Sequence, residues 1–450
     1  MSQQTAGVKA KALSTSRYGR TTDEMEAERE GAVALTRNLF RRNSRQPQGC
    51  QGIMTSLSEA PERTAAEPGL ERDHLIRYAR HLSLAEIGLE GQARLGAARV
   101  LVVGAGGLGS PVALYLAAAG VGEIGLVDAD VVDVTNLQRQ IVHGQSTLGS
   151  LKVSSAAARL RDLNPDVRVV EVSQRLNRHN ALEILRGWHL IVDGSDNFPT
   201  RYLINDAAVM LKTPVVYGAI LKWEGQVSLF ATPEGPCYRC LFREPPPAGL
   251  VPSCADAGVV GALAGVVGSM QALEVIKAIV GAGTSLAGRL QLFDGLAGQW
   301  REIEVRRDPA CPMCGDEPSI HELVDYEQFC GVKADGRTPR SGSEREISAR
   351  RLHDLLQSTS PPLIVDVREA WEWRAGNLSQ QGALHLPLAS LASGLHGLPS
   401  DRLLVAVCSV GARSAGAAQW LREHGFEGAV NLQGGLQSWV RDVDPSFSLA

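Results

Sequence analysis

Residues 99–120 read RVLVVGAGGLGSPVALYLAAAG, and this stretch decides the fold of the larger part of the chain. An unbroken apolar run is followed by a glycine-rich turn, and an apolar helical pattern follows the turn. The segment EIGLVDAD at residues 123–130 supplies another apolar run soon afterwards. Apolar runs without alternation, separated by helical segments, are typical of a parallel sheet that is covered by helices on both faces. The sequence therefore predicts an α/β fold with a parallel-rich sheet.

The same alternation extends in both directions from this stretch. Residues 73–82 (DHLIRYARHL) are predicted to form one helix before it, and strands are expected within 189–196, 214–220 and 225–230 after it. Residues 331–346 are rich in Gly, Arg and Ser, have no apolar face and are interpreted as an interdomain linker. A second, shorter α/β pattern follows. We therefore expect a disordered extension at 1–70, a larger α/β domain at 71–330 and a smaller α/β domain at 347–450.

Composition and charge narrow the class of protein. The 450 residues exceed what one core usually organises, and Met54 offers an alternative start within the polar extension. A formal net charge of −4 gives no general attraction to nucleic acid or to an anionic membrane. The most apolar segment, residues 257–267, is too short to span a bilayer and is predicted to be a buried core helix. Eight cysteines without an export signal indicate metal or thiol chemistry in the cytosol.

The glycine-rich turn is a candidate nucleotide site. Gly104, Gly106, Gly107 and Gly109 follow a strand and open a helix, so backbone N–H groups and the helix N-terminus converge where a phosphate can approach closely. Asp128 ends the next strand, where a carboxylate can accept hydrogen bonds from ribose hydroxyls. This pattern predicts a Rossmann-like domain. By itself it leaves ATP, NAD and a tight turn without a ligand as alternatives.

Residues downstream favour ATP over NAD. The segment VVDVTNLQRQ at 131–140 contains Arg139, and Lys152 follows a predicted turn. These two side chains are suited to neutralise phosphate oxygens as pyrophosphate departs, and Asp196, in DGSDN at 193–197, is suited to hold Mg²⁺. Each of these residues taken alone is equally well explained as a solvated charge. Their order along the chain is what favours triphosphate chemistry.

At this point residues 73–315 resemble the MoeB/ThiF family of ubiquitin-activating-enzyme-like adenylyltransferases. The resemblance rests on GAGGLGSP, VDVTNLQRQ, Lys152, SDN, and the later EGQ and PCYRC segments. It implies that ATP or its magnesium contacts Gly107, Asp128, Thr135, Asn136, Leu137, Gln138, Arg139, Lys152, Asp196 and Asn197. Arg80 matches an arginine that the family supplies to the site of the partner subunit, which implies a homodimer.

Two C-x-x-C pairs are a candidate metal site. Cys237 and Cys240 form one pair, and Cys311 and Cys314 form the other. Four thiolates are the tetrahedral donor set that structural zinc prefers, although two redox dithiols remain an alternative. The resemblance also favours a structural Zn²⁺ without a catalytic role.

Cys254 lies in VPSCADAG, in a predicted loop between Pro and Gly signals. It matches a family cysteine that is proposed to bond covalently to the carrier protein or to help release it. A small core residue is the alternative interpretation. Cys50 and Cys330 have no assigned role.

Residues 347–443 resemble a rhodanese domain through DVREAWEW, GALHLPL, LQGGLQSW and the loop at 408–414 (CSVGARS). The loop joins a strand to a helix, so its N–H groups are expected to surround the sulfur of Cys408 and stabilise a thiolate or persulfide, with Arg413 adding charge. A C-x5-R phosphatase would need arginine at position 414, where serine stands. One departure from the family is visible, because Asn377 replaces a frequent histidine after Gly376.

These parts together predict an adenylyltransferase and sulfurtransferase. A ubiquitin-like sulfur-carrier protein ending in Gly-Gly would be adenylated with ATP, and a persulfide on Cys408 would then convert its C-terminus to a thiocarboxylate. A cysteine desulfurase or thiosulfate would load Cys408. The carrier would serve molybdopterin, thiamine, cysteine or tRNA thiolation. An NAD-dependent oxidoreductase and a non-enzymatic scaffold for ubiquitin-like proteins are the alternatives.

Overall fold

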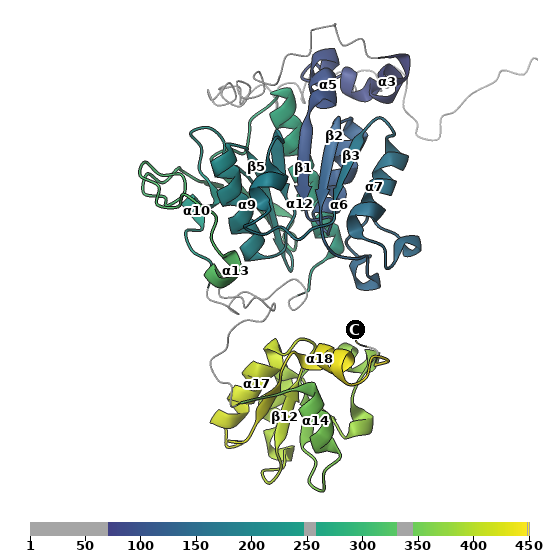
Figure 1. The fold of residues 1–450 in the computed structure, drawn as a ribbon, viewed down its shortest axis with the longest axis vertical. Helices are drawn as coiled ribbons and strands as arrows, with labels where there is room; N and C mark the ends of the chain where they lie inside the picture. Colours follow the sequence, from purple (N-terminus) through teal and green to yellow (C-terminus); the bar gives the residue numbers. More distant parts are fainter. Residues whose placement is uncertain (1–70, 247–257, 331–344, 448, 450) are drawn as a thin grey trace, which may run out of the picture. The chain divides into compact units, whose positions relative to one another are not determined.

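Figure 1 shows a computed structural model of the chain, which describes residues 71–246, 258–330, 345–447 and 449. The described residues contain two sheets. The predicted extension at 1–70 and Cys254 lie outside the described residues, as does most of the predicted linker. Glu346, the last residue of that linker, is the first residue of a strand in the smaller sheet.

The larger sheet has the strand order β3-β2-β1-β4-β5-β6-β7-β8. The five strands from β3 to β5 pair in parallel, and β6, β7 and β8 continue the sheet as antiparallel neighbours. The predicted α/β fold with a parallel-rich sheet is confirmed. The strands are β1 (Arg99–Val103), β2 (Glu123–Val127), β3 (Arg168–Val172), β4 (Leu190–Asp193), β5 (Val215–Leu221), β6 (Glu224–Phe230), β7 (Arg289–Asp294) and β8 (Gln299–Glu304).

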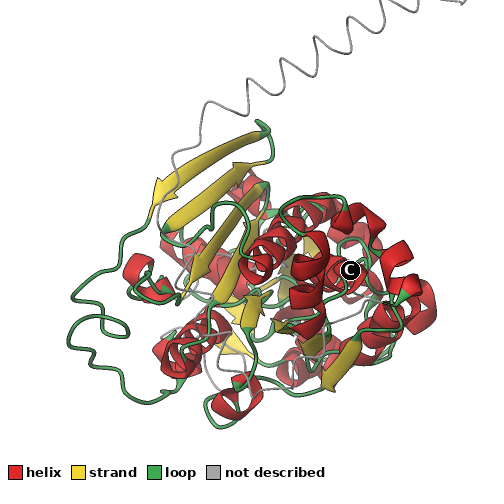
Figure 2. Cartoon of the chain, turned by 90° about the horizontal axis from the view of Figure 1, so that it is seen from above, coloured by secondary structure: helices red, strands yellow, loops and turns green. Residues whose placement is uncertain are grey.

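Helices cover both faces of this sheet because alternate residues of its central strands enter two cores. Val100 and Val102 of β1 lie in the core under α6, α7 and α12, whereas Leu101 and Val103 lie in the core under α8 and α9. Figure 2 shows these helices in red and the strands in yellow. The helices are α3 (Arg72–Arg77), α4 (Ala79–Leu82), α5 (Gly88–Ala97), α6 (Gly109–Ala119), α7 (Lys152–Leu163), α8 (Ala181–Leu185), α9 (Phe198–Leu211), α10 (Tyr238–Leu241), α12 (Gly261–Val280) and α13 (Tyr326–Phe329), with short 3-10 turns at Val134–Asn136 and Gln145–Thr147.

The prediction of one helix over 73–82 is wrong, because α3 and α4 are separated at Tyr78. Tyr78 is buried, and its hydroxyl accepts a hydrogen bond of 2.9 Å from Nδ2 of Asn164 at the end of α7. A tertiary contact therefore interrupts a pattern that favours a helix locally.

Helix α12 is longer than the apolar run in the sequence suggested. Among the described residues, this 20-residue helix is the one that is long and apolar enough to cross a membrane, and 61% of its most apolar window is buried. Two polar residues that follow the apolar run are buried and make hydrogen bonds within the core. Gln271 donates to the carbonyl of Asp193 at 2.8 Å, and Glu274 accepts from the backbone of Leu286. The helix packs on α6, β5 and β6 as a core helix, as predicted.

The smaller sheet has the order β11-β10-β12-β13-β9, and every pairing in it is parallel. Leu404 and Ala406 of β12 enter one core, and Val405 and Val407 enter the other. Its strands are β9 (Glu346–Ile347), β10 (Leu363–Asp366), β11 (Leu384–His385), β12 (Leu404–Val407) and β13 (Val430–Leu432). Its helices are α14 (Ala349–Leu356), α15 (Ala370–Ala375), α16 (Leu391–Gly394), α17 (Ala412–Glu423) and α18 (Gly435–Asp442), with 3-10 turns at Ser379–Gln381, Leu388–Ser390 and Leu395–Gly397.

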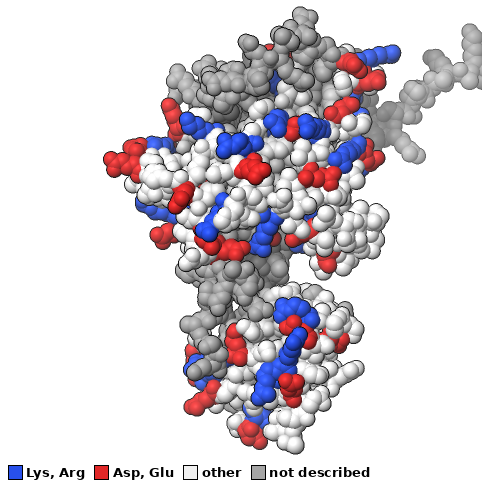
Figure 3. Space-filling view, in the orientation of Figure 1, with Lys and Arg blue, Asp and Glu red and all other residues white. Residues whose placement is uncertain are grey.

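Basic and acidic side chains are interspersed on the face of the molecule that Figure 3 shows. No continuous field of one sign covers the described part of that face. The distribution agrees with the small net charge, so charged ligands are expected to bind through local sites.

Candidate active sites and metal centre

A cavity of about 300 Å³ lies at the carboxyl ends of β1, β2 and β4. The strand order reverses between β1 and β4, and such a switch point is where open α/β sheets bind ligands. Many of the predicted nucleotide-site residues line this one cavity, namely Gly104, Gly106, Gly107, Asp128, Arg139, Lys152, Asp196 and Asn197.

The glycine loop is shaped by two close approaches of backbone. Gly104 has a φ of +94°, which favours glycine, and it follows the last residue of β1. A Cβ on Gly109 would lie 1.8 Å from the carbonyl oxygen of Gly104. Gly109 does not line the cavity, so its role in this structure is to let α6 begin directly against the loop.

Asp128 ties the glycine loop to the end of β2. One carboxylate oxygen accepts from the backbone N–H of Ala105 and the other from that of Asp130, each at 2.9 Å. His143 supports the same loop from behind, because its ring nitrogens lie 2.9 Å from the carbonyl oxygen of Ala105 and from Oγ of Ser155. Burial lowers the pKa of His143, so the ring is neutral near pH 7.

The two predicted cations reach the cavity in different ways. Lys152 begins α7, is 6% exposed, and its Nζ lies 2.8 Å from the carboxylate of Asp130. Arg139 donates to the carbonyl of Thr135 at 3.1 Å, which folds its side chain back over the turn. Thr135, Asn136, Leu137 and Gln138 form that turn and do not line the cavity. Arg139 therefore lines the cavity, whereas the turn supports it from outside.

Arg201 is a cavity residue that the sequence reasoning missed. It lies in the first turn of α9, and it donates to the carbonyl of Ser195 at 3.2 Å. Burial alone would lower the pKa of Arg201, but Tyr217 and Asp193 outweigh burial and raise it, so the guanidinium stays charged. A signal was present in the sequence: Asn197 caps α9, and Arg201 follows four residues later on the same helical face.

A buried carboxylate shapes the turn that carries Asp196. Asp193 is 2% exposed, and one of its oxygens accepts from the backbone N–H and the hydroxyl of Ser195, at 2.9 and 2.6 Å. Burial raises the pKa of Asp193. Asp196 lies beyond this turn and is exposed toward the cavity, where a cation can reach it.

The two C-x-x-C pairs meet in space. The sulfur atoms of Cys237, Cys240, Cys311 and Cys314 all lie within 4.8 Å of one another. The backbone N–H of Asp308 points at Sγ of Cys240 from 3.4 Å, which suits a thiolate. Four convergent thiols with a backbone donor fit a tetrahedral Zn²⁺.

A buried ion pair fixes the first C-x-x-C pair to α9. Arg239 lies between the two cysteines and binds both oxygens of Asp206 at 2.8 Å, and both side chains are almost fully buried. The hydroxyl of Tyr326 donates to the same carboxylate at 2.7 Å. The helix that carries Arg201 in its first turn therefore carries the anchor of the cysteine cluster just past its middle.

The loop after β12 surrounds the sulfur of Cys408 with hydrogen-bond donors. Cys408 is fully buried, and its Sγ accepts from the backbone N–H groups of Gly411 and Ser414 at 3.1 and 3.4 Å. The hydroxyl of Ser414 lies 3.3 Å from the same sulfur. Gly411 has a φ of +91°, so a residue with a side chain would strain this loop. The cradle is suited to a sulfur anion.

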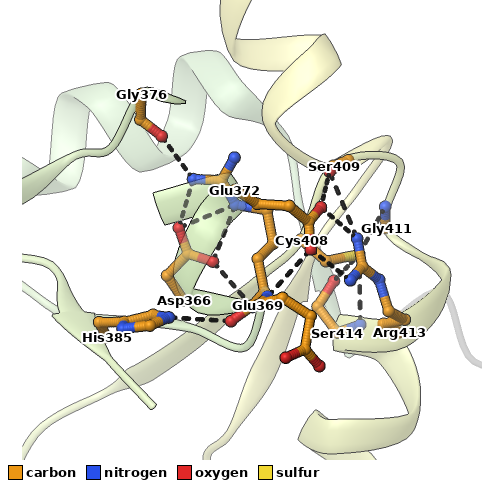
Figure 4. A network of polar contacts seen from close by, with 11 residues as sticks. Asp366, Glu369, Glu372, Gly376, His385, Cys408, Ser409, Gly411, Arg413 and Ser414 are labelled. Carbon is orange, nitrogen blue, oxygen red and sulfur yellow. Dashed lines mark hydrogen bonds and ion pairs between the residues drawn. The ribbon is translucent and has the colours of Figure 1, made fainter. Parts of the chain in front are cut away.

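Arg413 belongs to the sulfur loop, but its guanidinium holds a carboxylate. Its guanidinium binds both oxygens of Glu372 in α15 at 2.7 and 2.6 Å. Ser409 donates to the same carboxylate at 2.9 Å, and Figure 4 shows these side chains converging. Burial alone would raise the pKa of Glu372, but hydrogen bonds from Arg413, Glu369 and Ser409 outweigh it and lower it to about 2. The nearest donors to the sulfur are thus the two backbone N–H groups, and the Ser414 hydroxyl lies beside it.

Arg80 and Cys254 are two further predicted site residues that the described part of the chain does not bring to these sites. Arg80 is exposed on α4 and does not line the cavity. Cys254 lies outside the described residues. The structure therefore leaves both assignments as predictions.

Comparison with known proteins matches both parts of the chain. The ThiF family model matches residues 78–313, and the rhodanese-like domain model matches residues 348–442. A probable adenylyltransferase/sulfurtransferase MoeZ of Mycobacterium tuberculosis is 45% identical over 88% of this chain and 99% of its own length. The adenylyltransferase and sulfurtransferase MOCS3 of Bos taurus is 41% identical over 94% of this chain and 99% of its own. The sulfur carrier protein adenylyltransferase of Thermus thermophilus is 55% identical over 58% of this chain and 98% of its own.

Proposed function

Because this chain belongs to the ThiF family and continues into a rhodanese-like domain, we propose that it adenylates the C-terminal glycine of a ubiquitin-like sulfur-carrier protein and then transfers sulfur to it. The chain is an enzyme with adenylyltransferase and sulfurtransferase activity, like its relatives. The convergence of Arg139, Lys152 and Asp196 on one cavity carries the adenylation half. The donor-lined sulfur of Cys408 supports the transfer half.

In the first reaction, the carboxylate of the carrier attacks the α-phosphate of ATP, and pyrophosphate leaves. Arg139, Lys152 and Arg201 surround the cavity with positive charge, which stabilises the oxygens that gain charge in the transition state. We assign Mg²⁺ to Asp196 and Asn197, and the ion would add neutralising charge at the phosphates. The acyl adenylate that results is an activated acyl group.

In the second reaction, the terminal sulfur of a persulfide on Cys408 attacks the carbonyl carbon of the adenylate, and AMP leaves. An acyl disulfide now joins the carrier to Cys408. A thiolate attacks Sγ of Cys408 and releases the carrier as a thiocarboxylate, leaving a disulfide that a dithiol reductant reopens. We assign this thiolate to Cys254. The sulfur that loads Cys408 comes from a cysteine desulfurase or from thiosulfate.

The remaining assignments belong to the same proposal. We assign Zn²⁺ to the four clustered cysteines, where it would clamp distant segments together without a chemical step. We assign Arg80 to the cavity of a second copy in a homodimer, and we place the enzyme in the cytosol, without nucleic-acid or membrane partners. The carrier is a molybdopterin-synthase small subunit or a ThiS-like protein.

Exchange of pyrophosphate into ATP tests the adenylation half. Exchange is expected to require a carrier with a free Gly-Gly terminus, because the carrier carboxylate is the nucleophile. Asp196→Ala should abolish it, whereas Cys408→Ser should retain it, since sulfur enters only after adenylation. Exchange by Asp196→Ala at the wild-type rate would reject the assignment of Asp196.

A further inference from the structure

The hydroxyl of Ser414 lies between two acceptors. Its Oγ is 2.7 Å from Oδ1 of Asn431 and 3.3 Å from Sγ of Cys408. A serine hydroxyl has one proton, so it donates to one of these atoms at a time. The direction of this hydroxyl therefore decides whether the sulfur receives a third hydrogen bond.

Glu346 fixes the orientation of the Asn431 amide. Nδ2 of Asn431 lies 3.0 Å from Oε1 of Glu346. An ionised carboxylate accepts and does not donate, so the amide nitrogen must face Glu346 and the amide oxygen must face Ser414. The backbone holds the same geometry, because the N–H of Asn431 donates to the carbonyl of Arg345 at 3.0 Å and β13 pairs with β9 at Glu346.

Asn431 wins the competition for the proton of Ser414. The 2.7 Å oxygen–oxygen separation is that of a full-strength hydrogen bond, whereas the sulfur of a neutral thiol is a weak acceptor. Turning the proton to the sulfur would cost the Asn431 oxygen this bond. With its proton on the Asn431 side, Ser414 presents a lone pair to Cys408. This arrangement accepts a hydrogen bond from the neutral thiol but gives no donor to a thiolate or persulfide.

Two ion pairs lie beside the loop. Arg413 of α17 binds Glu372 of α15 (Figure 4), and Arg368 binds Asp366 at the end of β10. On the side of β9 and β13, Glu346 is the charged group that reaches the sulfur through hydrogen bonds. A change at Glu346 can therefore act on Cys408 without disturbing the two ion pairs.

We propose that Glu346 and Asn431 are positioning residues that turn the hydroxyl of Ser414 away from Cys408. When Glu346 no longer holds the amide, Asn431 rotates, its nitrogen faces Ser414, and the hydroxyl proton turns to the sulfur anion. Glu346 begins β9, at the end of the predicted interdomain linker. This residue is thus connected to the sulfur through Asn431 and Ser414. An effect of this orientation on turnover rests on the proposed function, in which Cys408 carries the sulfur.

Alkylation of Cys408 by iodoacetamide in the full-length protein tests the inference. The rate is followed from pH 5 to 10 by mass spectrometry of peptide 403–413, which contains Cys408 as its one cysteine. Neither ATP nor carrier is present, so the result does not depend on the proposed reaction. The variants are Glu346→Ala, which removes the acceptor of the Asn431 amide, Ser414→Ala and the double variant, with Glu427→Ala, at an exposed carboxylate after α17, as the control.

Glu346→Ala should lower the pH midpoint of alkylation by about one unit, because the anion gains a donor. Ser414→Ala should leave the midpoint close to that of the wild type, and the double variant should match Ser414→Ala. The control should match the wild type. A midpoint that rises by about a unit in Ser414→Ala would overturn the inference, since Ser414 would then already donate to the sulfur. An unchanged midpoint in Glu346→Ala, or the same fall in the double variant, would also overturn it.

Discussion

The guanidinium of Arg413 holds both carboxylate oxygens of Glu372, at 2.7 and 2.6 Å, so the one arginine in the sulfur loop is paired with an acid from another helix. This pair fixes the start of α17 against α15. Because Glu372 is 5% exposed, the pair also places a charge in a largely buried position.

Glu372→Gln should therefore destabilise the protein. It leaves Arg413 partly buried without its counter-charge, and we expect a loss of about 2 kcal/mol in the free energy of unfolding at pH 7. The pKa of Glu372 is lowered from 4.5 to about 2, so its contribution is complete above pH 4.5 and is lost as the pH falls toward 2. Urea unfolding followed by tryptophan fluorescence measures both effects.

The difference in stability between wild type and Glu372→Gln should accordingly shrink as the pH falls below 4.5. Glu427→Gln, at an exposed position, controls for the loss of one carboxylate. A difference that stays constant down to the lowest measurable pH would contradict the role given to the ion pair.

His143, behind the glycine loop, should give the free energy of unfolding a second dependence on pH. Its pKa is lowered by burial, so the folded ring stays neutral while the unfolded ring binds a proton below pH 6.5. The stability that this residue contributes is therefore present above pH 6.5 and lost as the pH falls below it. His143→Gln should remove this component from the pH dependence of unfolding. The exposed His396→Gln should keep it, and an unaltered profile in His143→Gln would refute the assignment.

Arg201 should matter to adenylation although the sequence motifs did not identify it. Arg201→Ala removes a charged donor from the cavity, and we expect kcat/KM for carrier-dependent pyrophosphate exchange to fall about 100-fold. Arg175→Ala is the matched control, because Arg175 also lines the cavity but is 76% exposed and pairs with Glu327. Equal losses in the two variants would show that general positive charge, and not Arg201, is what the reaction needs.

The cysteine cluster predicts one zinc ion per chain. Cys237→Ser removes one of the four thiolates, so we expect loss of bound zinc and a lower melting temperature. Elemental analysis of the purified protein measures the zinc content. Cys330→Ser should retain zinc because Cys330, although buried, lies outside the cluster. Full zinc content in Cys237→Ser would exclude the proposed site.

Sequence patterns predicted the elements whose structure depends on residues close by in the sequence. The run at 99–120 gave β1, the glycine loop and α6, and the spacing of Cys237, Cys240, Cys311 and Cys314 gave a cluster that the structure assembles. Tertiary contacts explain the differences. Burial of Tyr78 divides a helix, and burial of Gln271 and Glu274 extends another through polar residues.

In the sites, too, residues in linear motifs were predicted, and residues that depend on tertiary contacts were not. Arg139, Lys152 and Asp196 were predicted because they belong to linear motifs, and they meet in one cavity. Arg201 and Glu372 were missed because their importance depends on the carbonyl of Ser195 and on Arg413, which are positioned by folding. The disordered extension at 1–70, the role of Cys254 and the domain limits remain predictions.

The proposed enzyme couples ATP use to sulfur delivery, and the mass of the carrier reports this coupling. The enzyme is incubated with ATP, thiosulfate, a dithiol reductant and each candidate carrier, and intact-protein mass spectrometry follows the carrier C-terminus. With the wild type, we expect sulfur to replace one oxygen at the C-terminus of at least one carrier. Cys408→Ser should yield carrier adenylate without this replacement. Thiocarboxylate formed at the wild-type rate by Cys408→Ser, or ATP-independent sulfur transfer, would contradict it.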